Sequence, residues 1–325
     1  MSSSDDVILL ITHSGDFFTI DRVAEALSKK GARWFRFDTD KFPLEIQLTA
    51  KFDRSQSSHR LQYGDESIDT DEVRAVWMRR IWKPNLGQDL TPQYQAACIQ
   101  ESAATLSGFW DSLRDARWID DLERINAAQN KQRQLRVASE VGLNIPRTTI
   151  ANNPAAVREL FQQVQGKMVT KLLTTLSYSM EYSPFFLYTS TVKEEDLLNA
   201  ESLRYCPMVF QEKIPKQLEL RVVFVRGQVF VGALDASVYE ESTVDWRKPG
   251  VEVGSWQNHE LPDEIVGKIQ ALMTEFGLSF GALDFILTPS GEYVFLEVNP
   301  IGEWGMLERD LHLPISQAIA DALVA

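Results

Sequence analysis

Residues 280–300, with the sequence FGALDFILTPSGEYVFLEVNP, constrain the fold more than any other stretch of the chain. Two apolar runs, 282–287 and 293–298, are separated by a Pro-Ser-Gly sequence, and these residue types reverse the chain. The pattern predicts two antiparallel strands joined by a turn. Any function of this stretch must therefore come from the side chains that interrupt the apolar runs.

Three oxygen-bearing side chains interrupt them. Asp284 lies in the first predicted strand, and Glu297 and Asn299 lie in the second. Glu297 and Asn299 are two positions apart and leave the same face, and strand pairing can bring Asp284 beside them. Mg²⁺ prefers carboxylate and amide oxygens completed by water and phosphates, so the three are candidate magnesium ligands. Solvent-facing polar residues at strand ends are the alternative, which the surrounding apolar residues oppose.

Composition limits the class of protein. The chain has 325 residues, 44% of them hydrophobic and 24% charged, enough for two or three subdomains with cores of their own. A formal net charge of −13 argues against nucleic acid or a membrane surface as a partner, and no apolar window reaches the length of a membrane span. The polar, acidic N-terminus predicts no signal peptide.

Cysteine and histidine usage points to the compartment. Cys98 and Cys206 are the two cysteines, too few for a disulfide framework or a cysteine-rich zinc site. The four histidines are scattered without metal-ligand spacing, which argues against a zinc hydrolase. We therefore expect a protein of a reducing compartment, the cytoplasm.

The N-terminal part of the chain begins with a predicted strand, helix and strand. Val7–Thr12 is a continuous apolar run typical of a buried parallel strand, residues 20–27 repeat at helical spacing, and residues 32–37 read as a second strand. This order predicts a doubly wound β-α-β unit. A long helical pattern follows over 92–113, and we place the first boundary near residue 120.

Charged residues follow two predicted strands in this part. Asp38 and Asp40 stand at the carboxyl end of one strand, where open α/β sheets bind ligands, and turn or cap chemistry explains them equally well. Arg79 and Arg80 end another strand and must point to opposite faces, so only one can face a cleft. An arginine facing a cleft could hold a carboxylate or phosphate, although arginine side chains more commonly lie at the surface.

The second half of the chain carries a candidate phosphate site. Lys171 interrupts an apolar run over 167–172, and a buried lysine needs an anionic partner such as a phosphate. The loop that follows, TTLSYS, could meet phosphates with backbone amides and hydroxyl groups, although it lacks glycine. The chain contains no Walker sequence, which excludes an ordinary P-loop enzyme.

A predicted hinge and hairpin come next. The run 208–214 ends in a polar hinge whose backbone could pair with adenine, while Glu212 or a later carboxylate takes the ribose hydroxyls. Glu219 and Arg221 share one face of the following strand. Near the carboxylate cluster, Arg221 would clamp a phosphate or acyl phosphate, and a Glu219–Arg221 pair facing solvent is the structural alternative.

The order of these pieces is more specific than any one of them. VTKLL, FQEKIPKQLELRVVFV, VDWRK, FGALDF and FLEVNPIGEW, within about residues 125–305, resemble the ATP-grasp ligases. Within that superfamily they are similar to the microviridin-type ligases, which cross-link ribosomally made precursor peptides, the graspetides or omega-ester-containing peptides. The resemblance implies an ATP-grasp fold of the α/β class, with α+β character in the C-terminal half.

The resemblance also implies three domains and a set of site residues. The domains are an N-terminal pre-ATP-grasp domain (1–120), a central subdomain with a peptide-docking region (121–206) and a C-terminal subdomain with the magnesium site (207–325). In the nucleotide site, Lys131 and Lys171 would bind the phosphates, Gln211, Glu212 and Ile214 the adenine, and Glu219 the ribose. Asp284, Glu297 and Asn299 would bind magnesium, and Arg221 and Arg247 would bind the transferred phosphoryl group and the acyl phosphate. Glu195 and Asp196 would pair with an arginine of the leader.

The general base and the leader-docking residues each have an open alternative. Asp235 is only a candidate general base, because related ligases often carry a different polar group in its place. Glu195 and Asp196 lie in VKEEDL, and acidic residues at a helix N-terminus are favourable there without any partner.

The activity implied is macrocyclisation. ATP, with Mg²⁺, would phosphorylate an Asp or Glu side chain of a leader-bearing precursor, and a Thr or Ser hydroxyl or a Lys amine of the same peptide would displace phosphate, giving a macrolactone or macrolactam. The alternatives are a ligase joining a free amino acid or amine to a small carboxylate substrate, and a nucleotide-binding scaffold without catalysis, which the intact ligand set opposes. We expect a homodimer, with the apolar helices around 92–113 and 312–325 as candidate interfaces.

Overall fold

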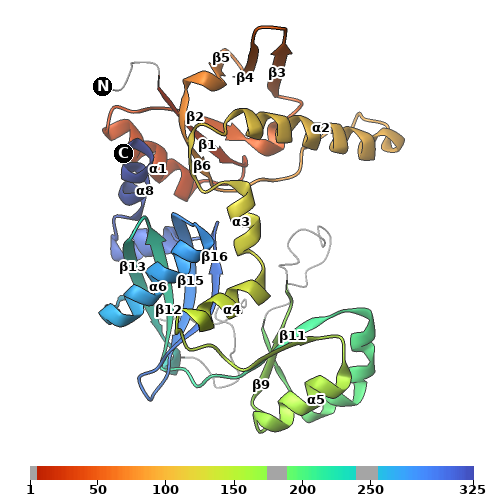
Figure 1. Ribbon diagram of the computed structural model, residues 1–325, viewed down its shortest axis with the longest axis vertical. Helices are drawn as coiled ribbons and strands as arrows, with labels where there is room; N and C mark the ends of the chain where they lie inside the picture. The colour runs from red at the N-terminus through yellow and green to blue at the C-terminus, as the bar shows by residue number, and fades with distance from the viewer. Residues whose placement is uncertain (1–5, 174–188, 239–254) are drawn as a thin grey trace.

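The structure, a computed structural model, describes residues 6–173, 189–238 and 255–325, and this described part contains four β-sheets. Figure 1 shows a sheet with its helices at one end of the molecule and further sheets at the other, with the long helix α2 projecting sideways. The mixture of helices, a parallel sheet and antiparallel sheets confirms the predicted α/β class with α+β character in the C-terminal half.

The N-terminal sheet is parallel and has the strand order β2-β1-β6-β7. Side chains of β1 alternate between two cores: Ile8 and Leu10 face helix α1, and Leu9 and Ile11 face helix α2. Both faces are covered, so β1 is a buried apolar run, and the predicted β-α-β unit is confirmed. Its elements are β1 (Val7–Thr12), α1 (Phe18–Lys29), β2 (Arg33–Asp38), β6 (Val73–Met78), α2 (Pro92–Ser112) and β7 (Arg117–Ile119).

A small antiparallel sheet extends from this part. The predicted pair of strands is present, and a third strand joins it in the order β3-β4-β5. Two single 3-10 turns lead into and out of this insertion. The elements are a turn over Thr39–Lys41, β3 (Ile46–Phe52), β4 (Ser57–Tyr63), β5 (Glu66–Asp69) and a turn over Thr70–Glu72.

The central sheet is antiparallel, in the order β10-β9-β11-β8. Helix α5 and a long 3-10 segment pack on it through a core that includes Val157, Leu203 and Phe210. The elements are β8 (Thr148–Ala151), α5 (Pro154–Gln163), β9 (Met168–Lys171), β10 (Ser190–Val192), the 3-10 segment Glu194–Tyr205 and β11 (Met208–Glu212).

The C-terminal sheet has five strands in the order β14-β13-β12-β15-β16. Helices α3 and α4 pack against it, and their starts are capped by Asp121 and Asn130, whose side chains accept backbone N–H groups. The elements are α3 (Leu122–Ala128), α4 (Lys131–Glu140), β12 (Leu218–Val225), β13 (Gln228–Asp235), a 3-10 turn (Ala236–Val238), β14 (Gln257–Asn258), α6 (Asp263–Phe276), β15 (Phe280–Leu287), β16 (Tyr293–Asn299), α7 (Gly305–Leu311) and α8 (Ile315–Val324).

The last helix ties the two ends of the chain together. Helix α8 packs against α1, and Ile315, Ile319 and Leu323 of α8 are buried in the same core as the N-terminal sheet (Figure 1). The apolar face of the helix predicted around 312–325 is thus used inside the chain rather than offered to a second copy. Helix α2 keeps exposed apolar side chains, Tyr94 at 54% and Ile99 at 37%.

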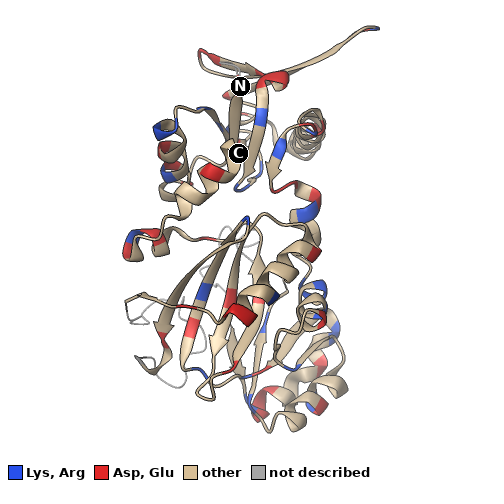
Figure 2. Cartoon of the chain, turned by 60° about the vertical axis from the view of Figure 1, so that its left-hand side comes forward, with Lys and Arg blue, Asp and Glu red and all other residues tan. Residues whose placement is uncertain are grey.

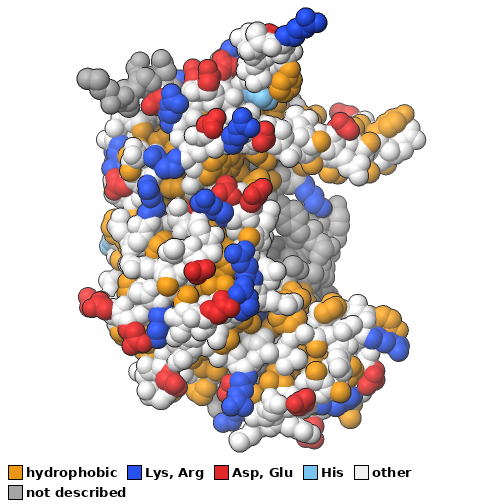
Figure 3. All heavy atoms as spheres, in the orientation of Figure 1, with side chains coloured by type: hydrophobic (Ala, Val, Ile, Leu, Met, Phe, Trp, Pro, Cys, Tyr) orange, Lys and Arg blue, Asp and Glu red, His pale blue; other side chains and the backbone are white. Residues whose placement is uncertain are grey.

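Charges of both signs mix over the surface. Figure 3 shows Lys and Arg beside Asp and Glu across the described atoms of that face. Among the described helices, none combines the length and apolar character needed to cross a membrane.

Candidate functional site

The paired carboxylates lie in the C-terminal sheet. Asp284 on β15 stands directly opposite Glu297 on β16, and the amide of Asn299 donates to Glu297 Oε1 at 3.3 Å. Strand pairing shifts by one residue immediately after Asp284, so β16 carries an extra residue there. Bulges of this kind redirect side chains at the edges of sites. In Figure 2, single charged residues, coloured blue or red, interrupt strands that are otherwise tan.

Two lysines from other elements converge on Glu297. Lys131, the first residue of α4, has its Nζ 2.9 Å from Glu297 Oε2, and Lys171, the last residue of β9, has its Nζ 3.7 Å away. Burial alone would raise the pKa of Glu297, but the two ammonium groups outweigh it, and the pKa lies well below its ordinary value. The Glu297 carboxylate therefore stays ionised inside the protein.

A third cation accompanies Asp284. Arg221 on β12 is the cross-strand partner of Asp284, and its Nη1 lies 2.8 Å from Asp284 Oδ1. Arg221 is 7% exposed, and its buried Nε has no hydrogen-bond partner among the described residues. Glu219 accepts from Lys216 Nζ at 2.5 Å. Glu219 and Arg221 therefore pair with Lys216 and Asp284, respectively, and do not form the alternative Glu219–Arg221 pair. Arg221 is left with donor capacity for an anion.

A pocket opens next to these groups. It has about 950 Å³ of empty space, part of it open solvent, between the central and the C-terminal sheets. Predicted site residues line much of it, and apolar side chains line the rest. The lining comprises Pro146, Val169, Lys171, Thr189, Gln211, Glu212, Lys213, Ile214, Lys216, Glu219, Leu220, Arg221, Trp256, Asp284, Phe285, Ile286, Leu296 and Glu297.

The hinge at one side of the pocket is held by its neighbours. The backbone N–H of Glu212 donates to the carbonyl oxygen of Arg147 at 2.9 Å, and that of Lys213 donates to the carbonyl oxygen of Lys167 at 2.8 Å. Gln211 is 4% exposed, and its carboxamide donates to Thr148 Oγ1 at 3.0 Å. These contacts fix the path of β11 as it leaves the sheet, so the backbone at the hinge is preorganised.

Comparisons with known proteins show the family of the chain. Residues 7–126 match a family model described as the MvdD pre-ATP grasp domain. The crystal structure of macrocyclase MdnB from Microcystis aeruginosa MRC is 63% identical in sequence, covers 98% of this chain and 99% of its own, and has a TM-score of 0.84. The chain belongs to the microviridin-type ATP-grasp macrocyclase family.

Two further relatives extend the comparison of this ATP-grasp ligase. MdnC from the same organism, bound with precursor peptide MdnA, is 37% identical, with coverage of 98% and 99% and a TM-score of 0.87. A RiPP-associated ATP-grasp ligase of Chryseobacterium gregarium, in complex with ADP and a leader and core peptide, is 31% identical, with coverage of 98% and 96% and a TM-score of 0.89. No curated protein sequence matches the chain.

The residues of this ligase fit a magnesium ion. The described residues hold no group of three His, Cys, Asp or Glu side chains that could bind a metal, so two carboxylates and the Asn299 amide are the available set. Mg²⁺ typically takes one or two carboxylates and completes its octahedron with waters and phosphates. Asp284, Glu297 and Asn299 beside two lysines and an arginine suit a magnesium ion that arrives with a nucleotide.

Other predicted residues of this ligase lie away from the pocket. Asp235 accepts from the backbone N–H and hydroxyl of Ser237, at 2.8 and 2.7 Å, and these hydrogen bonds lower the pKa of Asp235. Asp196 accepts from the backbone N–H of Lys193 at 2.8 Å, and Glu195 pairs with the Lys193 ammonium at 3.3 Å, on an exposed surface. Arg247 and the TTLSYS loop lie outside the described residues.

Sequence reasoning missed part of the site. Lys213, Lys216 and Trp256 line the pocket, although the sequence pattern gave none of the three a role of its own. Of the two positions open for an arginine at the end of this strand, Arg79 takes the inward one, because it is 1% exposed and its guanidinium pairs with the Glu303 carboxylate. The only hint available was the alternation along the strand, which required either Arg79 or Arg80 to point inward.

The two aspartates near the N-terminal strands have structural partners. Asp40 accepts from the backbone N–H and the hydroxyl of Ser14, at 2.8 and 2.5 Å, and Asp38 accepts from Arg36 Nε at 2.8 Å. The contact of Asp38 is an ion pair within β2 without a side-chain cap, and that of Asp40 joins it to the loop after β1, so these contacts are structural but are neither the expected turn nor the expected cap.

Proposed function

We propose that this ATP-grasp ligase closes rings in a leader-bearing, ribosomally made precursor peptide. It activates Asp or Glu side chains of the peptide as acyl phosphates, forming ADP, and a Thr or Ser hydroxyl or a Lys amine then displaces phosphate. The observation that carries the proposal is the 63% identity to a macrocyclase over 98% of the chain. The pocket supports it, because cations and carboxylates meet there without any protein nucleophile being required.

The residues divide the work by charge. Lys131 and Lys171 already share one carboxylate, so they are the cations that meet nucleotide phosphates entering the pocket. Arg221 has a buried N–H to offer to the transferred phosphoryl group. Glu297, Asp284 and Asn299 hold the magnesium ion, which when bound neutralises charge on the phosphates. The hinge Gln211, Glu212 and Ile214 takes adenine, and Glu219 takes ribose.

Peptide docking is assigned to the central subdomain. Glu195 and Asp196 lie in the first turn of the 3-10 segment, and Leu198, at 81% exposure, and Tyr205, at 78%, lie further along it. Acidic side chains beside exposed apolar ones suit an amphipathic leader that carries an arginine. The Lys193–Glu195 pair is fully at the surface, where such pairs contribute little, so a leader arginine can replace it.

The remaining assignments follow the same reasoning. The domains extend over 1–120, 121–206 and 207–325, Asp235 is the candidate general base, and Arg247 assists Arg221.

The enzyme works in the cytoplasm as a homodimer, with α2 as the interface, because its Tyr94 and Ile99 remain exposed. Sedimentation analysis of Ile99→Asp tests this interface, since a charged side chain there should give monomers.

The intact mass of a microviridin-type precursor with its leader attached tests the activity. The peptide is incubated with the enzyme, ATP and Mg²⁺, and then treated with mild base. Loss of one water per ring, reversed by base, identifies a macrolactone, and loss that survives base identifies a macrolactam. A precursor lacking its leader is the control and should react more slowly.

One outcome contradicts the proposal. If the precursor keeps its mass and ADP appears only when free amino acids or amines are supplied, the enzyme joins small substrates instead. Glu195→Lys then provides a second check, because it should weaken the reaction of the full-length precursor but leave any small-substrate activity unchanged.

A further inference from the structure

Arg79, at the end of strand β6 in the N-terminal sheet, reaches into the C-terminal half of the chain. Its side chain is fully buried, and its Nη1 donates to the carbonyl oxygen of Ile301 at 2.8 Å. Its Nη2 donates to Glu303 Oε2. Ile301 and Glu303 lie in the loop that leaves β16 immediately after Asn299.

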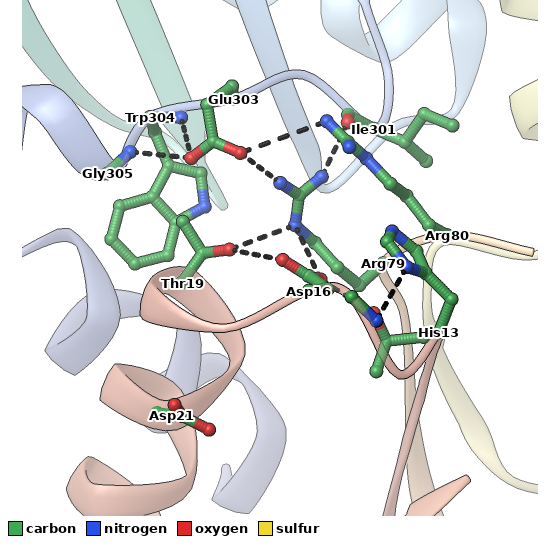
Figure 4. Close-up of polar contacts among 12 residues, drawn as sticks. His13, Asp16, Thr19, Asp21, Arg79, Arg80, Ile301, Glu303, Trp304 and Gly305 are labelled. Atoms are coloured by element: carbon green, nitrogen blue, oxygen red, sulfur yellow. Dashed lines mark hydrogen bonds and ion pairs between the residues drawn. The ribbon is translucent and has the colours of Figure 1, made fainter. Parts of the chain in front are cut away.

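The arginine is itself held from the N-terminal side. Figure 4 shows the guanidinium between Asp16 and Thr19 on one side and Ile301 and Glu303 on the other. Arg79 Nε lies 3.4 Å from Thr19 Oγ1 and 3.7 Å from Asp16 Oδ2, and Thr12 and Thr19 donate to Asp16 at 2.6 and 3.1 Å. With its planar group fixed at both ends, Arg79 has one geometry in which to hold the loop.

The loop transmits this position to Asn299. The backbone N–H of Gly302 donates to the carbonyl oxygen of Asn299 at 3.0 Å, which closes a turn. A Cβ on Gly302 would lie 2.4 Å from Ala282 Cβ and 3.0 Å from Asn299 Cβ, so the turn is pressed against β15. Glu303 fixes the other end of the loop, because its Oε1 accepts from the backbone N–H groups of Trp304 and Gly305 at the start of α7.

We propose that Arg79 is a positioning residue for the magnesium ligand Asn299. The inference rests on the proposed function, in which Asn299 binds magnesium. By holding Ile301 and Glu303, Arg79 fixes the turn that orients the Asn299 amide, so the N-terminal domain contributes to a metal site that it does not touch. Groups that orient a ligand from behind typically change metal affinity by about 10–100-fold when removed.

The test compares Arg79→Met with a second interdomain arginine. Arg117 on β7 of the same sheet donates to the carbonyl oxygen of Leu323 in α8, far along the chain from the magnesium loop. Arg117→Met therefore removes a similar contact between the two halves without touching the loop. Two quantities are measured on full-length protein: ADP affinity by calorimetry with and without Mg²⁺, and the Mg²⁺ concentration giving half-maximal ADP formation.

For Arg79→Met we expect the Mg²⁺ requirement to rise about 10-fold and the Mg²⁺-dependent gain in ADP affinity to shrink equally. ADP affinity without Mg²⁺ should stay the same. Arg79→Lys should fall between, because an ammonium keeps the charge but not the planar fork. Arg117→Met should lower the melting temperature and leave the Mg²⁺ requirement unchanged. Equal shifts in Arg79→Met and Arg117→Met would overturn the proposal.

Two further variants keep the result interpretable. Asn299→Ala must raise the Mg²⁺ requirement; if it does not, the proposed magnesium site is wrong, whereas a shift in Asn299→Ala without one in Arg79→Met refutes the role of Arg79 alone. If Arg79→Met does not fold, Glu303→Gln carries the test. Its carboxamide oxygen can still accept at the start of α7, while the charge that holds Arg79 is lost, so the Mg²⁺ requirement should rise several-fold.

Discussion

Asp284 and Glu297 stand opposite each other across the β15–β16 hairpin, and the two carboxylates pair with different cations. Arg221 lies 2.8 Å from Asp284, and Lys131 lies 2.9 Å from Glu297. The hairpin fixes the distance between the two carboxylates, while the cations come from three other elements, β12, α4 and, with Lys171, β9. The site is therefore a rigid pair of anions surrounded by cations that a nucleotide phosphate can engage.

Replacing Glu297 by glutamine should disable the metal site. The change removes one magnesium ligand and leaves Lys131 and Lys171 beside a neutral amide. We expect Mg²⁺-dependent ADP formation to fall roughly 100-fold or more, the scale for losing a group that stabilises transition-state charge. Steady-state ADP release measures it. Glu292→Gln, in the exposed turn of the same hairpin, is the control, and an equal loss there would contradict the assignment.

Much of this site could be predicted because strands have a short, regular period. The hairpin was expected over 282–287 and 293–298 and extends over Phe280–Leu287 and Tyr293–Asn299. Once two strands are paired, polar residues inside apolar runs must lie close together, which is how Asp284 and Glu297 came to be predicted as neighbours. Lys171 followed from the same reasoning, since a lysine inside a strand needs an anion.

The contacts between domains could not be predicted in this way. Arg79 and Glu303 are 224 positions apart, and neither belongs to a repeating pattern that would pair them. The sequence left open whether Arg79 or Arg80 points inward, and the packing of α8 and the β16 loop against the N-terminal sheet encloses Arg79. Likewise the bulge beside Asp284 has no sequence signal such as glycine at the extra residue.

Arg221→Lys should separate binding from phosphoryl transfer. Lysine keeps the positive charge near Asp284 but cannot offer the planar, multiple N–H donors of arginine. We expect the rate of ADP formation at saturating ATP and precursor to fall about 100-fold, with little change in ADP affinity. Single-turnover kinetics and calorimetry measure the two quantities. Arg226→Lys, in the turn of the β12–β13 hairpin, should behave like the parent enzyme; a matching loss of rate there would argue against a specific role.

Gly302→Ala should disturb the magnesium loop directly. The new methyl group would lie 2.4 Å from Ala282 Cβ, and the backbone oxygen of Asn299 lies 3.1 Å away, so the turn must shift. Overpacking of this kind costs about 1–3 kcal/mol of unfolding free energy, and here it should also raise the Mg²⁺ requirement. Gly267→Ala in α6 is the matched control, because nothing lies within 4 Å of its new methyl group. An unchanged Mg²⁺ requirement in Gly302→Ala would show that the turn does not orient Asn299.

Asp120 should make the stability of the domain junction depend on pH. Its carboxylate lies between β7 and α3 and accepts backbone N–H groups of Ser279 and Phe280, at 2.9 to 3.0 Å, where strand β15 begins. Burial raises the pKa of Asp120 from 3.8 to about 6, more than these hydrogen bonds lower it.

Between these two pKa values the folded protein holds a proton that the unfolded chain has lost. Stability contributed by this group must therefore fall as the pH rises from 3.8 towards 6. Asp120→Asn removes the titrating group. The urea midpoint of the parent should therefore fall relative to that of the variant as the pH rises through this window. The full change corresponds to about 3 kcal/mol. Parallel pH profiles for the two proteins would mean that Asp120 has the same pKa in the folded and the unfolded chain, with its N–H donors offsetting the cost of burial.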